Sequence, residues 1–286
     1  MTTGLLVIDK PEGITSSGVV TAVRRATGIK KAGHAGTLDP MATGVLVVAL
    51  GPATRLVRYV QDGAKEYVAT VQFGIATESL DADGDETERL AMNFSEAELR
   101  QALEGFKGQS SQIPPMVSAV KVGGKRLYEL AREGKVVARD ARLIYVTELE
   151  LVEFEAEPDF PVATLRVVSS KGTYIRTLAD DIARALGGRA HLKGLRRTRV
   201  GPFDLDGALS LDDLEEWPTR LVPPADAVSE LSPWFVTTEE ATEIGFGRAL
   251  AAVAGTGPWA MMGAGDELLA VYRRDGDRAV AEVVLA

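Results

Sequence analysis

The chain has 286 residues and carries 32 Lys and Arg against 41 Asp and Glu, so its formal net charge is −9. At roughly 150 residues per domain this length predicts one large domain and a small one, and 45% hydrophobic with 26% charged residues is typical of a folded protein. The lack of cysteine excludes disulfides, a thiolate nucleophile and cysteine-ligated metal centres, and two histidines are too few for a histidine-rich metal site.

The first fifty residues predict a strand, a helix and a second strand. Residues 5–8 are a short apolar run that ends at a Pro- and Gly-containing turn. A helix is predicted to begin at a cap formed by Ser16 or Ser17 and to end at Gly28. Its expected apolar face comprises Val19, Val23 and Ala26. The apolar run at 45–50 predicts a buried strand.

The middle of the chain predicts strands and two amphipathic helices. Hydrophobic and polar side chains alternate over residues 65–73, which indicates a half-buried strand. Ser95 and Glu98 form a capping box for a helix that reaches about Glu104. Apolar side chains at helical spacing predict another helix over 174–186. Further strands are predicted at 117–122, 143–154 and 162–169.

Two other segments are distinctive. Residues 78–88 are acidic but lack the ligand spacing of a calcium-binding loop, so we expect a solvated loop there. Near the C-terminus, a short helix capped by Thr237 or Thr238 precedes two strands, at 267–274 and 278–285, that flank a hairpin signal. The pattern predicts an α+β fold with domains at 1–225 and 230–286.

Charge is unevenly distributed along the chain. Net charge is +4 over residues 1–60, −8 over 61–105, +6 over 106–200 and −11 over 201–286. A net negative charge by itself argues against a nucleic-acid partner. Residues 184–199, however, hold six basic side chains and no acid, which can form an anion-binding face. A solvated helix or strand edge is the alternative interpretation of that run.

The segment at residues 33–48, GHAGTLDPMATGVLVV, gathers three glycines, His34, Asp39 and Pro40 into a loop before a strand. Its glycines permit close approach of the backbone to a ligand, and Asp39 lies at a rigid turn. Taken singly, an Asp-Pro pair is ordinarily a turn and a lone histidine is ordinarily structural. Neither histidine lies in a nucleophile-elbow context, whereas a carboxylate nucleophile remains available.

Five segments occur in a defined order along the first two hundred residues. They are DKPEGITS at 9–16, GHAGTLDPMATGVL at 33–46, KEY at 65–67, QIPPMVSAVK at 112–121 and SKGTYIRTLADDIARALG at 170–187. Together they closely resemble the bacterial TruB family of tRNA pseudouridine synthases. The resemblance extends from Asp9 to about Gly201, which is the whole predicted catalytic region.

The resemblance implies a specific reaction and fold. Members of the family isomerise the T-loop uridine conventionally numbered 55 in tRNA: uracil is detached from C1′, rotated and rejoined through C5, with no cofactor or metal. The implied core has a mixed, largely antiparallel sheet with flanking helices, followed by a small, mainly β, PUA-like C-terminal domain. A family member acting on another RNA or with a guide RNA, and a non-catalytic RNA-binding or RNA-folding protein, are the alternatives.

The resemblance also implies roles for individual residues. Asp39 matches the essential catalytic aspartate, Tyr67 the aromatic residue that stacks on the target base, and Arg176 the arginine that pairs with the catalytic carboxylate. The implied substrate-binding residues are His34, Leu195, Lys10, Gly33 and Gly36. Among them, His34 would stack in the T loop in place of the flipped nucleotide, and Lys10 belongs to a motif that supports the catalytic loop.

Ordinary structural roles remain open for two of these residues. Arg176 has Asp180 at i+4, a spacing typical of a pair on a helix surface. Tyr67 lies on an alternating strand, where cross-strand packing is usual.

The expected partner is tRNA, bound through its T arm with one uridine flipped out. We expect a monomer with no membrane association and no obligate protein partner. The N-terminal sequence lacks the basic start of a signal peptide and no apolar run approaches 18 residues, so a cytoplasmic location is expected. Whether the acidic C-terminal region contacts RNA stays open.

Overall fold

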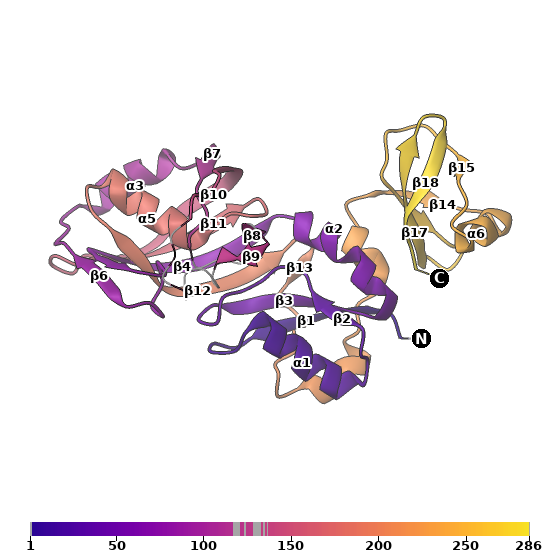
Figure 1. The fold of residues 1–286 in the computed structure, drawn as a ribbon, viewed down its shortest axis with the longest axis horizontal. Coiled ribbons are helices and arrows are strands. Elements are labelled where there is room, and N and C mark those ends of the chain that lie inside the picture. Colours follow the sequence, from indigo (N-terminus) through magenta and orange to yellow (C-terminus); the bar gives the residue numbers. More distant parts are fainter. Residues whose placement is uncertain are drawn as a thin grey trace. The chain divides into compact units, whose positions relative to one another are not determined.

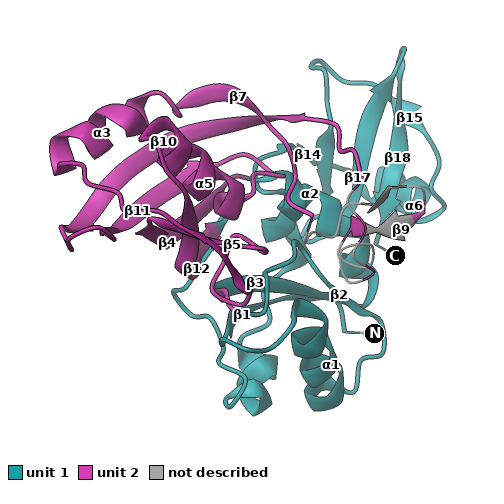
Figure 2. Cartoon of the chain, turned by 60° about the vertical axis from the view of Figure 1, so that its left-hand side comes forward, with its two compact units in different colours: residues 1–40, 44–63, 200–286 teal, residues 41–43, 64–199 magenta. Residues whose placement is uncertain are grey.

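The protein forms two compact units, which Figure 2 colours separately. Unit 1 comprises residues 1–40, 44–63 and 200–286, and unit 2 comprises residues 41–43 and 64–199. The computed structural model describes residues 2–116, 121–122, 124–127, 133, 135 and 137–285. The strand predicted at 117–122 therefore lies largely outside the described residues. The domain boundary predicted between residues 225 and 230 is a different partition of the chain and stays a prediction.

Unit 1 begins with two strands that bury both of their faces. In chain order its first elements are β1 (Gly4–Lys10), α1 (Ser16–Thr27), β2 (Ala32–His34), β3 (Thr43–Leu50), η1 (Gly51–Leu56) and α2 (Val57–Asp62). β1 pairs antiparallel with β3 along its whole length, and β2 pairs with the end of β3. Because successive side chains of a strand point to opposite faces, one set packs against α1 and the other joins a second cluster.

The helix α1 differs in detail from its prediction. Its cap is Thr15, whose hydroxyl accepts from the backbone N–H of Gly18, and not Ser16 or Ser17. The Ser16 hydroxyl is unavailable because it is bonded to Leu38. Ala26 is exposed, and Val20 is buried beside Val19 and Val23. The predicted end is confirmed: Gly28 adopts φ 71°, a left-handed conformation that glycine allows at a helix C-terminus.

The last part of unit 1 is a small, mainly β region, as predicted. Its elements are β13 (Phe203–Asp204), η2 (Leu214–Thr219), η3 (Pro224–Val228), β14 (Ser232–Phe235), α6 (Thr238–Gly245), β15 (Leu250–Ala251), β16 (Trp259–Met262), β17 (Leu268–Asp275) and β18 (Arg278–Val284). The five strands β14 to β18 form a sheet in the order β14-β16-β17-β18-β15. The predicted hairpin is confirmed as β17–β18, and Thr237 completes a capping box with Glu240.

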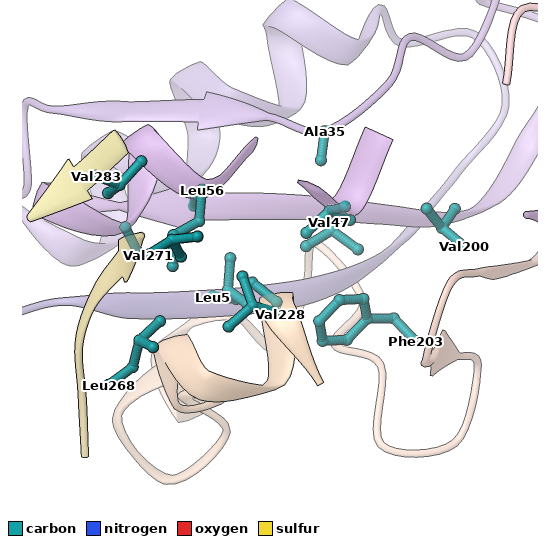
Figure 3. Packing of buried hydrophobic residues seen from close by; sticks show 14 of the residues in the cluster. Leu5, Ala35, Val47, Leu56, Val200, Phe203, Val228, Leu268, Val271 and Val283 are labelled. Atoms are coloured by element: carbon teal, nitrogen blue, oxygen red, sulfur yellow. The ribbon is translucent and has the colours of Figure 1, made fainter. Parts of the chain in front are cut away.

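This C-terminal sheet shares a hydrophobic core with the N-terminal strands. Leu268, Val271 and Val283 belong to the same buried cluster as Leu5 and Leu56 (Figure 3). Burying such side chains from both ends of the chain removes apolar surface from water and ties the two segments together.

A polar contact accompanies that core at the edge of α2. The Tyr59 hydroxyl donates to Glu282 Oε2 of β18 at 2.8 Å. Burial, with the hydrogen bond to Glu282, raises the pKa of Tyr59 to about 12, so the phenol stays protonated as a donor. The helix α2 is therefore linked to the last strand of the chain.

Unit 2 is a sheet covered by two helices. Its elements are β4 (Lys65–Phe73), β5 (Ile75–Thr77), β6 (Glu86–Arg89), α3 (Glu96–Glu104), β7 (Gly108–Gln112), β8 (Lys121–Val122), β9 (Lys125–Arg126), β10 (Arg142–Glu155), β11 (Val162–Ser169), α5 (Ile175–Ala185) and β12 (Ala190–Val200). Its main strands run in the order β12-β4-β11-β10-β7. The helix α3 contacts β10 and α5, and α5 contacts β4 (Figure 1).

The predicted elements of unit 2 agree closely with the structure. Burial alternates along β4, with Tyr67, Ala69, Val71 and Phe73 on the buried side, as expected for a strand whose one face is covered. The capping box of Ser95 before α3 is present. The sheet pairings among β4, β11, β10 and β7 are antiparallel. The α+β fold with a largely antiparallel sheet and flanking helices is confirmed.

The acidic segment at 78–88 is only partly the solvated loop that its composition predicts. Asp83 and Asp85 are exposed, but Ser79 and Asp81 are buried, and Asp81 forms an isolated bridge with Leu192. The prediction is wrong for Asp81 because this carboxylate has a buried cationic partner. No helix in the described part of the chain is both long and apolar enough to cross a membrane.

Candidate active site

The loop that carries Asp39 connects β2 to β3 and is held by its backbone. Ser16, at the start of α1, donates from its hydroxyl to the Leu38 carbonyl at 2.9 Å and accepts from the Leu38 N–H at 2.8 Å. Ser16 is buried, so both polar groups of Leu38 are satisfied away from water. The residue immediately before Asp39 is thereby fixed, while Asp39 itself is half-buried.

Pro40, the residue after Asp39, is held by hydrogen bonds from Lys10 and Gly13. Lys10 is fully buried and donates from Nζ to the carbonyls of Pro40, at 3.0 Å, and Pro11, at 2.9 Å. The Gly13 N–H also donates to the Pro40 carbonyl, at 2.8 Å. Hydrogen bonds from the segment at 9–16 therefore hold the backbone of the Asp39 loop in place on both sides of Asp39. This geometry supports the loop-supporting role of Lys10, and its predicted contact with substrate stays a prediction.

The other predicted residues of this loop lie on or just after β2. Gly33 and His34 are half-buried, and His34 pairs in register with Val48 of β3. Gly36 adopts φ 103°, where a side chain would be strained, so the turn after β2 requires glycine. A Cβ at Gly33 would meet open space, so packing does not explain that glycine. Their contacts with substrate stay predictions.

In unit 2, Tyr67 lies on the buried face of β4, near the start of the strand. It is 9% exposed and pairs in register with Val167 of β11. Among the residues that the structure describes, its hydroxyl has no hydrogen-bond partner. The Tyr67 oxygen is not among the buried side-chain atoms that lack a partner, so its ring is buried while its hydroxyl is accessible to solvent.

Arg176 lies in the first turn of α5 and is 3% exposed. Its Nη1 donates to the Ser79 carbonyl at 2.7 Å and lies 3.1 Å from Asp81 Oδ2. Asp81 also accepts hydrogen bonds from the Ser79 hydroxyl and, at 3.2 Å, from the Asp83 N–H. A buried ion pair of this kind needs such additional hydrogen bonds to offset the desolvation of both charges.

The alternative that pairs Arg176 with Asp180 on the helix surface is wrong. Asp180 is buried and accepts from Arg184 Nε at 2.9 Å and from Arg189 Nε at 2.7 Å. Arg176 points instead to the loop after β5. The sequence did not single out Asp81, because one acid among the many at 78–88 has no periodicity that marks it as buried.

Comparison with protein-family models identifies the family to which this chain belongs. Residues 24–175 match the model of the family described as TruB family pseudouridylate synthase (N terminal domain). The chain belongs to the TruB family. Residues 176–227 match a second model, described as tRNA pseudouridylate synthase B C-terminal domain.

Relatives of this TruB-family chain extend over most of its length. A tRNA pseudouridine synthase B of Symbiobacterium thermophilum is 48% identical over 86% of this chain and 82% of its own. One from Mycobacterium bovis is 40% identical over 99% of this chain and 95% of its own. Among solved structures, a Cbf5-Nop10-Gar1 complex contains a chain 29% identical, with a TM-score of 0.76 over 99% of this chain and 85% of that one.

The last predicted residues of this TruB-family site lie on β12. Leu195 is half-buried there, and its contact with substrate stays a prediction. The basic run at 184–199 is not a uniform cationic surface, because Arg184, Arg189 and Arg199 pair with acidic side chains and Arg197 is buried. In the described part of the chain, no cluster of three or more His, Asp and Glu side chains could hold a metal ion.

Proposed function

We propose that this chain is a tRNA pseudouridine synthase that converts the T-loop uridine conventionally numbered 55 into pseudouridine. The observation that carries the proposal is the likeness, over 99% of the chain, to a relative named tRNA pseudouridine synthase B. Relatives at 40–51% identity are named for tRNA, which favours tRNA over an RNA selected by a guide. The proposal includes tRNA as the partner, a monomeric protein and a cytoplasmic location.

The proposed reaction is balanced without any added reagent. The N1–C1′ bond of uridine breaks and the C5–C1′ bond forms, while C5 loses a proton and N1 gains one. Product and substrate are isomers, so no oxidant, reductant or leaving group is needed. A base stacked within the T loop is out of reach, so the enzyme must first flip the uridine out, which costs a few kcal/mol.

The roles of the side chains follow from their chemistry. The Asp39 carboxylate acts on the sugar or base during glycosidic cleavage, and the loop clasped by Ser16 and Lys10 supports it. The ring of Tyr67 holds the face of the uracil and helps to remove the C5 proton. Arg176 favours the ionised, oriented form of the catalytic carboxylate.

Replacement stacking belongs to the same proposal. His34, on a glycine-flanked loop, stacks in the T loop where the uridine has left, which compensates part of the flipping cost. Gly33 and Gly36 allow the RNA to approach the backbone, and Leu195 supplies an apolar contact to the base.

Purified protein incubated with unmodified tRNA transcript and EDTA is expected to form pseudouridine at position 55, detected by chemical mapping. A transcript with cytidine at that position is the control and should gain none. Binding of the transcript without any product would overturn the enzymatic proposal and favour an RNA-binding protein. Product only at other uridines or in another RNA would favour the alternative of a TruB-family enzyme that acts on a different RNA.

One cation of the basic run is expected to contribute to tRNA affinity. Lys193 is exposed on β12 and has no partner among the described residues. K193A should weaken tRNA binding several-fold and lower the slope of log affinity against log salt by about one. R184A is the matched control, because Arg184 is already compensated by Asp180, and should change the slope less. Equal affinity and slope for K193A and the wild type would contradict this prediction.

A further inference from the structure

We propose that Gln112 is a positioning residue that fixes the start of α5 and thereby the guanidinium of Arg176. Gln112 is the last residue of β7 and is 3% exposed. Its side-chain amide makes two hydrogen bonds to the backbone of Tyr174: Oε1 accepts from the Tyr174 N–H at 2.8 Å, and Nε2 donates to the Tyr174 carbonyl at 3.1 Å. It is the first residue of the segment QIPPMVSAVK, which the roles of Asp39, Tyr67 and Arg176 leave unexplained.

The hydrogen bonds between Gln112 and Tyr174 matter because Tyr174 lies at the start of α5. Tyr174 is the N-cap of α5, and its own side chain makes no capping hydrogen bond. Its backbone is extended, with φ −94° and ψ 106°, so its N–H and C=O lie on the same side and a single primary amide can bond to both. The Tyr174 carbonyl also accepts the first helical hydrogen bond, from the Leu178 N–H at 3.0 Å. Gln112 therefore holds the residue at which the helix begins.

The first turn of α5 depends on this contact more than most helix starts do. It has no acidic side chain to interact with the helix dipole and no side-chain cap of its own. Helix ends without such partners fray. Arg176 is the second residue of the helix, and its bonds to Ser79 and Asp81 require its Cα to stay in place.

The role of Gln112 rests on the proposed function, because Arg176 is assigned to catalysis there. Gln112 is not expected to touch the RNA, since its polar atoms are used by Tyr174. Its loss should therefore reduce the rate of the chemical step and leave tRNA affinity unchanged. A residue needed only for stability would lower the folded fraction without this separation.

The test compares Q112M with Q72M. Gln72, on β4 of the same sheet, is a matched control because its amide also donates to backbone carbonyls, chiefly that of Phe160 just before β11, at 2.9 Å, and has no bond to α5. In single-turnover assays with saturating tRNA, Q112M should slow pseudouridine formation by about 10-fold to 100-fold, because small misplacements of catalytic groups have effects of this size. The dissociation constant for tRNA should stay within twofold. Q72M should keep the wild-type rate.

Amide hydrogen exchange provides a readout that is independent of activity. Exchange at residues 174–178 should accelerate in Q112M and stay unchanged in Q72M, because the Tyr174 N–H loses its acceptor only in the first variant. Q112E retains an acceptor for that N–H but loses the donor to the carbonyl, so it should show an intermediate rate and intermediate exchange. Q112E also provides the test of the proposal if Q112M does not fold.

The two proposals fail in different ways. A wild-type protein that forms no pseudouridine would overturn the proposed function, while exchange at 174–178 would still decide the role of Gln112. An active wild type with wild-type rates in Q112M and Q112E, or with unchanged exchange at 174–178, would overturn the role of Gln112.

Discussion

Replacement of Asp39 by Asn is expected to abolish pseudouridine formation while leaving the fold and tRNA affinity nearly unchanged. The amide has the shape of the carboxylate but neither its charge nor its nucleophilicity. Removing the group that acts directly in a reaction typically lowers the rate by about 10⁴ or more. The surrounding loop should persist, because the bonds from Ser16 to Leu38 and from Lys10 to Pro40 use backbone groups.

The measurement is a single-turnover assay of D39N beside a binding titration with the same tRNA. E12Q is a suitable control, because Glu12 is an exposed carboxylate in the segment that clasps the loop, and it should retain the wild-type rate. Product formed by D39N near the wild-type rate would exclude Asp39 as the catalytic carboxylate. Loss of tRNA binding or of thermal stability together with activity would instead indicate a disrupted loop.

Replacement of Asp81 by Asn is expected to lower the free energy of unfolding of unit 2 by about 1.5–3 kcal/mol, the size of a buried hydrogen bond to a charged group. The substitution keeps the volume of the side chain but removes the negative charge that lies 3.1 Å from the buried guanidinium of Arg176. Replacing a charged acceptor by a neutral one weakens the hydrogen bond and removes the charge–charge attraction in a site that water does not reach. We also expect pseudouridine formation to fall, because one of the contacts that orient the Arg176 guanidinium is weakened.

Urea unfolding followed by circular dichroism measures this loss of stability. D85N provides the control: Asp85 is an exposed carboxylate in the same acidic segment, and its replacement should change the unfolding free energy by less than about 0.5 kcal/mol. Equal unfolding free energies for D81N and D85N would show that the Arg176–Asp81 pair contributes nothing to the stability of unit 2.

The elements that local sequence predicted well have strong local causes. The strand β4 follows from strict alternation, and α3 follows from the Ser95–Glu98 capping box, because both signals act between residues close in the chain. The hairpin of β17 and β18 follows from its turn residues in the same way. The predicted cap of α1 was wrong because a distant residue competes for the Ser16 hydroxyl. Ser16 is a residue type that caps helices well, but its hydroxyl is bonded to Leu38.

The same distinction between local and distant contacts applies to the candidate site. Asp39, Tyr67 and Arg176 could be named from the sequence because each lies in a segment that resembles the TruB family. The resemblance also implied that Lys10 supports the Asp39 loop. The bonds that do so, from Lys10 to Pro40 and from Ser16 to Leu38, could not be named, since they join residues 30 and 22 positions apart through backbone atoms that carry no sequence signal. The amide of Gln112 reaches Tyr174, 62 positions away, in the same way.

By itself, the sequence determined the family and the α+β class and singled out Asp39 as a candidate nucleophile, because these depend on residue types and on patterns within short segments. Only the tertiary structure decided that Asp81, and not Asp180, forms an ion pair with Arg176 and that Leu268 and Val283 share a core with Leu5. The physical reason is that burial and pairing are properties of contacts between distant segments. A carboxylate in an acidic run is solvated or buried according to what folds against it.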